Sequence, residues 1–154
     1  MKKIGVAAIA MALLLPVGLN AQRYQRDRRD LDERRGRVAG IIADLERRTN
    51  DFKVALRRAL DRSPMDGTRR EDQLNRDASN LERATNRLRE SWNADRDFDR
   101  SRRHLAVALS AGQDIHRTLS RHRLRGNVQR EWGAVREELN QLAAAFREPP
   151  IRWE

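Results

Sequence analysis

The three histidines are the side chains best suited to bind a metal or move a proton, so their spacing is the first test for an enzyme. His104, His116 and His122 fall in one expected helix, at separations of 12 and 6 residues. Two imidazoles hold a metal from one helix when they lie four residues apart on the same face, and neither separation meets this requirement. We therefore expect solvated or capping histidines and no metal.

Other patterns that support catalysis or cofactor binding are also missing. The chain has no cysteine, no glycine-rich phosphate loop and no pair of carboxylates framed by apolar residues. Residues 61–67 have the outline of a calcium loop, but Met65 occupies a ligand position and Gly67 comes one place late. The sequence therefore predicts neither an enzyme nor a cofactor.

Arginine is the residue type that most distinguishes this chain. The sequence has 33 Lys and Arg against 23 Asp and Glu, a net charge of +10. Residues 100–125 hold seven arginines and only one acidic residue, Asp114. The candidate anion-binding residues gather at the end of this segment: Arg117, Arg121, Arg123 and Arg125. Two interpretations remain open, namely an anion-binding surface and cations that only complement the dipole of a helix carboxyl end.

The partner of such a surface is constrained by what surrounds the arginines. Nucleic acid is not expected, because no aromatic residues on which bases could stack are interleaved and no binding motif precedes the cluster. An anionic envelope surface, such as lipopolysaccharide or anionic lipid head groups, or another protein is expected instead. The sequence gives no indication of the oligomeric state.

Apolar residues at helical spacing predict the elements that position these side chains. Leu31, Val38, Leu45, Phe52 and Ala59 recur every seven residues in a first helix, which should end near Arg62. Similar stripes predict three more helices. Their apolar positions are Leu74, Leu81 and Leu88 in the second, Leu105, Ala108, Ile115 and Leu119 in the third, and Val128, Trp132, Val135, Leu139, Leu142 and Phe146 in the fourth. We expect an all-α, antiparallel up-down four-helix bundle over residues 38–154.

Turn signals set the expected helix boundaries. Thr68 and Glu71 form a capping box after the Ser63-Pro64 and Asp66-Gly67 breakers, and Asn127 is the expected N-cap of the last helix. The third helix should stop around residues 125–126. The break at residues 97–100 contains neither Gly nor Pro, so a three-helix bundle with one continuous central helix is the alternative.

Both ends of the bundle carry further expectations. Residues 22–37 have seven basic and four acidic side chains and little to bury, so they should form a flexible basic N-terminal arm or the frayed start of the first helix. In an antiparallel bundle the tail after the fourth helix lies at the same end as Trp92. Ile151 and Trp153 are therefore expected to fold back onto Trp92 as a plug.

Residues 1–21 have the features of an export signal. Lys2 and Lys3 precede an apolar stretch from Ile4 to Leu15, and Ala21 ends a suitable cleavage site. A retained anchor is the alternative, but the apolar stretch is short. Cleavage would leave a protein that begins at Gln22, has a net charge of +8, is not integral to the membrane, and is located in the periplasm or outside the cell.

Part of the chain resembles a known group of proteins. Residues 60–72, with Asp66-Gly67-Thr68-Arg69-Arg70-Glu71-Asp72 as the most specific part, residues 82–89 and the seam from Trp132 to Phe146 are similar to secreted, arginine-rich, all-helical bacterial proteins. The resemblance covers most of the chain after residue 21 and implies export and a helical architecture. The group has no assigned activity, so the resemblance implies no site residues.

Two functional hypotheses from different classes follow. The first is an exported, non-enzymatic bundle that binds anionic envelope or extracellular partners through its arginines. The second is a periplasmic chaperone or stress-type protein that binds unfolded clients, which predicts an exposed apolar surface. A structural bundle that self-associates through a helix face also remains open, since such stripes build oligomers too.

Overall fold

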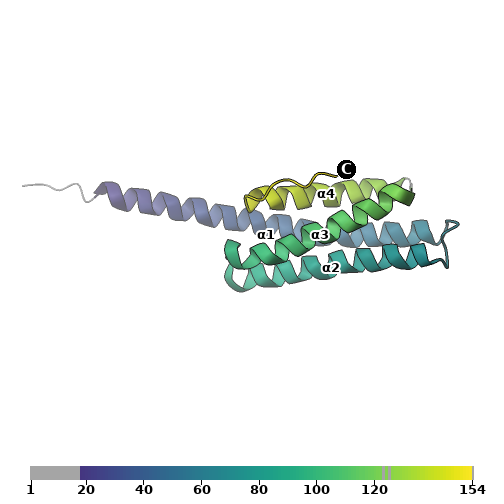
Figure 1. The fold of residues 1–154 in the computed structure, drawn as a ribbon. Helices are drawn as coiled ribbons and strands as arrows, with labels where there is room; N and C mark the ends of the chain where they lie inside the picture. The colour runs from purple at the N-terminus through teal and green to yellow at the C-terminus, as the bar shows by residue number, and fades with distance from the viewer. Residues whose placement is uncertain (1–17, 123, 125, 154) are drawn as a thin grey trace, which may run out of the picture. The chain divides into compact units, whose positions relative to one another are not determined.

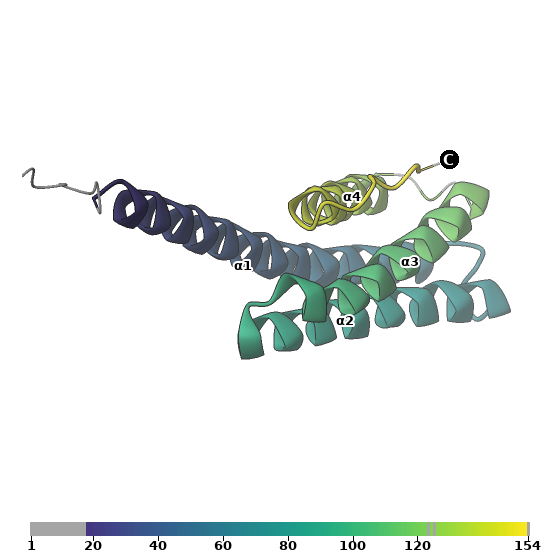
Figure 2. The ribbon, with the colours of Figure 1, turned by 60° about the vertical axis from the view of Figure 1, so that its left-hand side comes forward.

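Four α-helices form the fold of this protein in a computed structural model that describes residues 18–122, 124 and 126–153. Their bounds are Gly18–Leu60 for α1, Arg69–Asp95 for α2, Phe98–His122 for α3 and Asn127–Ala145 for α4 (Figure 1). The chain divides into two compact units, residues 1–32 and 33–154. In the second unit the helices pack as the expected antiparallel four-helix bundle, seen from a second direction in Figure 2.

Separate α2 and α3 helices exclude the three-helix alternative, although no Gly or Pro lies between them. Arg96 takes a left-handed conformation, with φ 49°, and its backbone N–H donates to the Trp92 carbonyl oxygen at 2.8 Å. Asp97 then caps α3, because its Oδ1 accepts from the backbone N–H of Arg100 at 2.8 Å. A left-handed residue and a capping carboxylate thus end one helix and start the next.

The predicted start of α2 is confirmed in detail. Thr68 is the N-cap, and its Oγ1 accepts from the backbone N–H of Glu71 at 3.4 Å. The Glu71 carboxylate reaches back and accepts from the backbone N–H of Gly67 at 2.7 Å, one residue earlier than in a standard capping box. The first helix ends at Leu60, two residues before the expected position.

The predicted N-cap of α4 is wrong. Gly126 occupies the cap position with φ 74°, and Asn127 is already the first helical residue. The Asn127 Oδ1 accepts from Arg130 Nη2 at 3.0 Å instead of capping a backbone N–H. The chain enters α4 through a positive φ that glycine adopts without strain, so the cap falls one residue earlier than the side-chain type suggested.

The core of the second unit follows the apolar stripes closely. In α1, Val38, Leu45 and Phe52 are each at most 1% exposed, whereas Leu31 is 44% exposed. Every predicted seam residue of α4 is buried. In the first unit, residues 18–32 are helical and the side chains from Gln25 to Asp32 are exposed. Residues 1–17, which hold most of the expected export signal, lie outside the described residues.

The aromatic residues close the bundle differently from the expected plug. Trp92 packs against Phe98 and Phe146, with ring centroids 4.9 and 5.6 Å away. Trp153 lies elsewhere, because the tail runs back alongside α4 (Figure 1) and places this ring 5.9 Å from Trp132. The expectation that Trp153 covers Trp92 is therefore wrong. Phe98, the first residue of α3, and Phe146, which follows α4, already pack against Trp92.

Candidate anion-binding site

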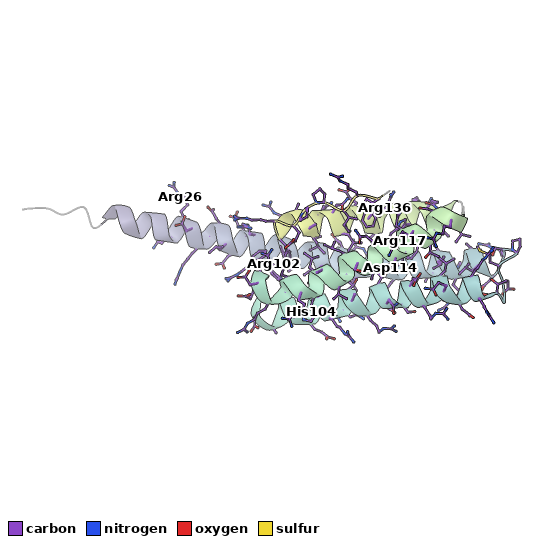
Figure 3. The ribbon with its side chains drawn as sticks, in the orientation of Figure 1. Arg26, Arg102, His104, Asp114, Arg117 and Arg136 are labelled. Carbon is purple, nitrogen blue, oxygen red and sulfur yellow. The ribbon has the colours of Figure 1, made fainter. Side chains whose placement is uncertain are left out.

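The predicted arginine cluster is only partly described by the structure. Arg117 and Arg121 are exposed on α3, whereas Arg123 and Arg125 lie outside the described residues. Arg117 Nη2 pairs with Asp114 Oδ1 on the preceding turn, and Figure 3 labels both side chains on α3. Arg121 makes no ion pair with the described residues. Of the two described arginines in the cluster, Arg117 is therefore compensated by a carboxylate and Arg121 is not.

Acidic side chains share the surface of this cluster. A hollow of about 390 Å³ between α2 and α3 is lined by both arginines together with Asp77 and Asp114. Asp77 is only 6% exposed, and its two oxygens accept from Gln73 Nε2 at 2.7 Å and Thr118 Oγ1 at 3.2 Å. The hollow is therefore of mixed charge, which reduces its attraction for anions.

Asp77 was missed by sequence reasoning, although its position contains a signal. It follows Leu74 by three residues and precedes Leu81 by four, which places it on the apolar face of α2. A carboxylate on that face needs hydrogen-bond donors, and Gln73 and Thr118 supply them. Asp77 thus links α2 to α3 and has a structural role.

His116 is the histidine with the most contacts among the described residues. Its Nδ1 accepts from Trp132 Nε1 at 3.3 Å, and its ring meets the edge of Trp153 with centroids 5.5 Å apart. His104 is half-buried on α3, and the His122 side chain lies outside the described part. No group of three His, Cys, Asp or Glu among the described residues is arranged to hold a metal ion.

The environment of His116 makes stability depend on pH. Burial lowers the pKa of His116 below its ordinary value of 6.5, the Arg136 guanidinium lowers this pKa further, and a backbone hydrogen bond with Trp153 opposes the change. The folded state therefore favours the neutral ring, whose Nδ1 accepts from Trp132. This contribution to stability is complete above pH 6.5 and is lost as the pH falls below that value towards the lower folded pKa.

We expect the His116→Gln variant to show a weaker fall in the free energy of unfolding between pH 8 and pH 5 than the wild type. Urea unfolding at each pH, followed by circular dichroism, measures this difference. The His104→Gln variant is the matched control for the loss of an imidazole elsewhere on α3. An unchanged pH dependence in His116→Gln would contradict the assignment.

A second group of arginines surrounds a groove between α1 and α4. The groove has a volume of about 540 Å³, and Arg34, Arg37 and Arg147 contribute its cationic side chains. Its remaining lining residues are uncharged: Val38, Ile41, Gln141, Ala144 and Ala145. Neither Arg37 nor Arg147 makes an ion pair with the described residues. We refer to this feature, defined by these eight residues, as the arginine groove.

Local structure holds two of these arginines at the groove. The Arg34 guanidinium lies over the Phe98 ring, 5.3 Å from its centroid. Arg147 follows α4 in a left-handed conformation with φ 59°, and its backbone N–H donates to the Ala144 carbonyl oxygen at 3.0 Å. The Glu148 N–H donates to the Ala143 carbonyl oxygen at 2.8 Å, which completes the pattern that ends many helices.

Two further hollows differ from the arginine groove in volume or in lining. The hollow between the second half of α1 and the start of α4 contains three arginines but also Asp51 and Glu131. A smaller one, of about 260 Å³, is lined by Gln113, His116, Arg117, Arg152 and Trp153. Sequence reasoning noted the basic excess of residues 22–37 but missed the groove, because Arg37 and Arg147 are far apart in the chain.

Comparisons with protein-family models, curated proteins and solved structures find no match for this chain. The resemblance of residues 60–72 to secreted helical proteins therefore remains a prediction. In the part of the chain that the structure describes, no helix combines the length and apolarity needed to cross a bilayer.

Proposed function

We propose that this chain is an exported, non-enzymatic helical bundle that binds anionic envelope or extracellular partners through its arginine side chains. The observation that carries this proposal is that Arg37, Arg121 and Arg147 make no ion pair with the described residues. The net charge of the full chain is +10, and removal of Lys2 and Lys3 with the expected export signal leaves +8, which adds long-range attraction for anionic surfaces. The export signal predicted in residues 1–21 would bring the protein to such surfaces.

Burial of the apolar residues favours this proposal over the chaperone hypothesis. Among the described residues, the large hydrophobic side chains that are exposed are Leu31, Val54 and Val107, each at most 50% exposed. Leu31 belongs to the first unit, and Val54 and Val107 lie on α1 and α3 of the second unit. A client-binding chaperone would expose a broad apolar patch. The seam of α4 is likewise buried inside the bundle, which disfavours self-association through that helix face.

We expect residues 22–154 to co-sediment with vesicles containing anionic lipid at low salt and to dissociate as salt increases. Each arginine near such a surface contributes about 1 kcal/mol, and this attraction is screened within about 10 Å at 0.1 M salt. Replacing Arg117, Arg121, Arg123 and Arg125 with glutamine should weaken binding about fivefold per charge removed. The effect at Arg117 should be smaller because Asp114 already compensates its charge.

Vesicles of neutral lipid are the control surface, and Arg87→Gln with Arg103→Gln is a control for removing exposed charge elsewhere. The mass of the protein released by an exporting host tests whether the chain begins at Gln22. Absence of binding at low salt, or binding that high salt leaves unchanged, would contradict the proposed electrostatic interaction.

A further inference from the structure

We propose that the arginine groove binds one single-chain amphiphile with an anionic phosphate head group. The alkyl chain would lie along Val38, Ile41, Ala144 and Ala145, and the phosphate would contact Arg37 and Arg147. This inference rests on the proposed function for the class of partner, and it adds a defined site and an apolar contribution. Binding in the groove differs from attraction to a charged surface, because the alkyl chain and the phosphate head group of one ligand must bind together.

The size and lining of the groove suit such a ligand. Its volume of about 540 Å³ lies within the range of small-molecule sites in proteins. Val38 is buried, Ile41 and Ala145 are half-buried, and Ala144 is exposed, so apolar surface extends from the core to the solvent. An alkyl chain placed there would remove the accessible surface of Ile41, Ala144 and Ala145 from water, whereas Val38 is already only 1% exposed.

The charges around the groove select an anionic head group. Three arginines and no acidic residue line it, in contrast to the mixed hollow that contains Arg117 and Asp114. A guanidinium presents a planar set of donors that matches two phosphate oxygens at once. Arg34 stacks on Phe98, so a cation stays at the groove while Arg37 and Arg147 are free to contact the phosphate.

The backbone conformation that ends α4 places Arg147 at the groove. Its φ of 59° belongs to the left-handed region, where glycine is the usual residue after a helix. The chain instead has an exposed arginine that lines the groove. A purely structural role is compensation of the carboxyl end of α4. That role predicts a change in stability without any change in ligand binding, so the two roles are separable.

The test uses the purified full chain and decyl phosphate below its micelle concentration, with isothermal titration calorimetry and amide chemical shifts as readouts. We expect wild-type binding with the largest shifts at Ala144 and Ala145. Arg37→Gln and Arg147→Gln should each weaken binding about tenfold or more, since each loses a charge-assisted hydrogen bond. Ala144→Trp should abolish binding by filling the groove. The matched control, Arg87→Gln with Arg103→Gln, should bind within about twofold of the wild type.

Two further ligands separate the contribution of the alkyl chain from that of the phosphate. Decyl maltoside has the alkyl chain without a phosphate, and inorganic phosphate has no alkyl chain. Weak or absent binding of both is expected, whereas binding of either as tight as decyl phosphate would overturn the inference. Wild-type affinity in both groove variants would overturn it as well. Sedimentation of the same variants with anionic vesicles distinguishes this site from the proposed function. Each groove variant removes one cation that also contributes to surface attraction, so its vesicle binding should weaken by no more than about fivefold. A loss of that size, together with a larger loss of decyl phosphate binding, supports two separable interactions. Absence of vesicle binding in the wild type overturns only the surface interaction.

Discussion

The Trp132→Ala variant is expected to lose about 3–5 kcal/mol of unfolding free energy. Trp132 is 1% exposed, and its ring contacts Phe52 of α1 at a centroid distance of 5.2 Å. It also contacts Trp153 of the tail at 5.9 Å and donates a hydrogen bond to His116 of α3. Truncation therefore leaves a cavity where three segments meet and leaves the His116 Nδ1 without its donor. Equilibrium urea unfolding followed by circular dichroism measures the loss.

Two control variants separate the parts of this effect. Trp132→Phe keeps an aromatic ring but removes the indole N–H, so it should be less destabilising and should also reduce the pH dependence assigned to His116. Val107→Ala changes a side chain that is 50% exposed and should alter stability by no more than about 0.5 kcal/mol. A loss below about 1 kcal/mol in Trp132→Ala would show that α1, α3 and the tail do not depend on this contact.

The Gly112→Leu variant is expected to be about 1–3 kcal/mol less stable than the matched variant Gly40→Leu. A Cβ atom at Gly112 would lie 2.7 Å from Leu139 Cδ1 and 3.4 Å from Trp153 Cη2. A Cβ atom at Gly40 would meet nothing within 4 Å. Both substitutions replace a helical glycine with a better helix former, which adds up to about 1 kcal/mol in each case. The difference between the variants therefore reports the clash at the α3–α4 contact.

Thermal and urea unfolding of both variants measure this difference, and limited trypsin digestion gives a second readout. If the added side chain displaces Trp153, cleavage after Arg152 should be faster in Gly112→Leu than in Gly40→Leu. Equal stability and equal cleavage rates in the two variants would contradict the close packing of Gly112 against Leu139 and the tail.

Most helix boundaries could be predicted because they depend on residues that are neighbours in the chain. Thr68 and Glu71 cap α2 within one turn, and the acidic residues around Asp97 begin α3. Asn127 was misassigned because the chain enters α4 through the positive φ of Gly126. A side chain that is able to cap does so only where the backbone reaches the cap geometry, and the preceding turn decides that.

The candidate site was less predictable than the helices. Counting charge along the chain located the arginines of α3, but it did not indicate that Asp77 of α2 lines the same hollow as Arg117 and Arg121. The same counting found the basic excess of residues 22–37 without indicating that Arg37 faces the same groove as Arg147. Charge compensation depends on which helices are adjacent, and linear counting does not contain that information.

The sequence by itself determined that this protein has four amphipathic helices, which residues form their buried stripes, and where most of the helices begin and end. These features follow from the helical period and from hydrogen bonds within a few residues. Only the tertiary structure decided the path of the tail, the His116–Trp132–Trp153 contacts, and the grouping of Arg34, Arg37 and Arg147. Each of these joins residues that are distant in the chain, so each depends on how the helices pack against one another.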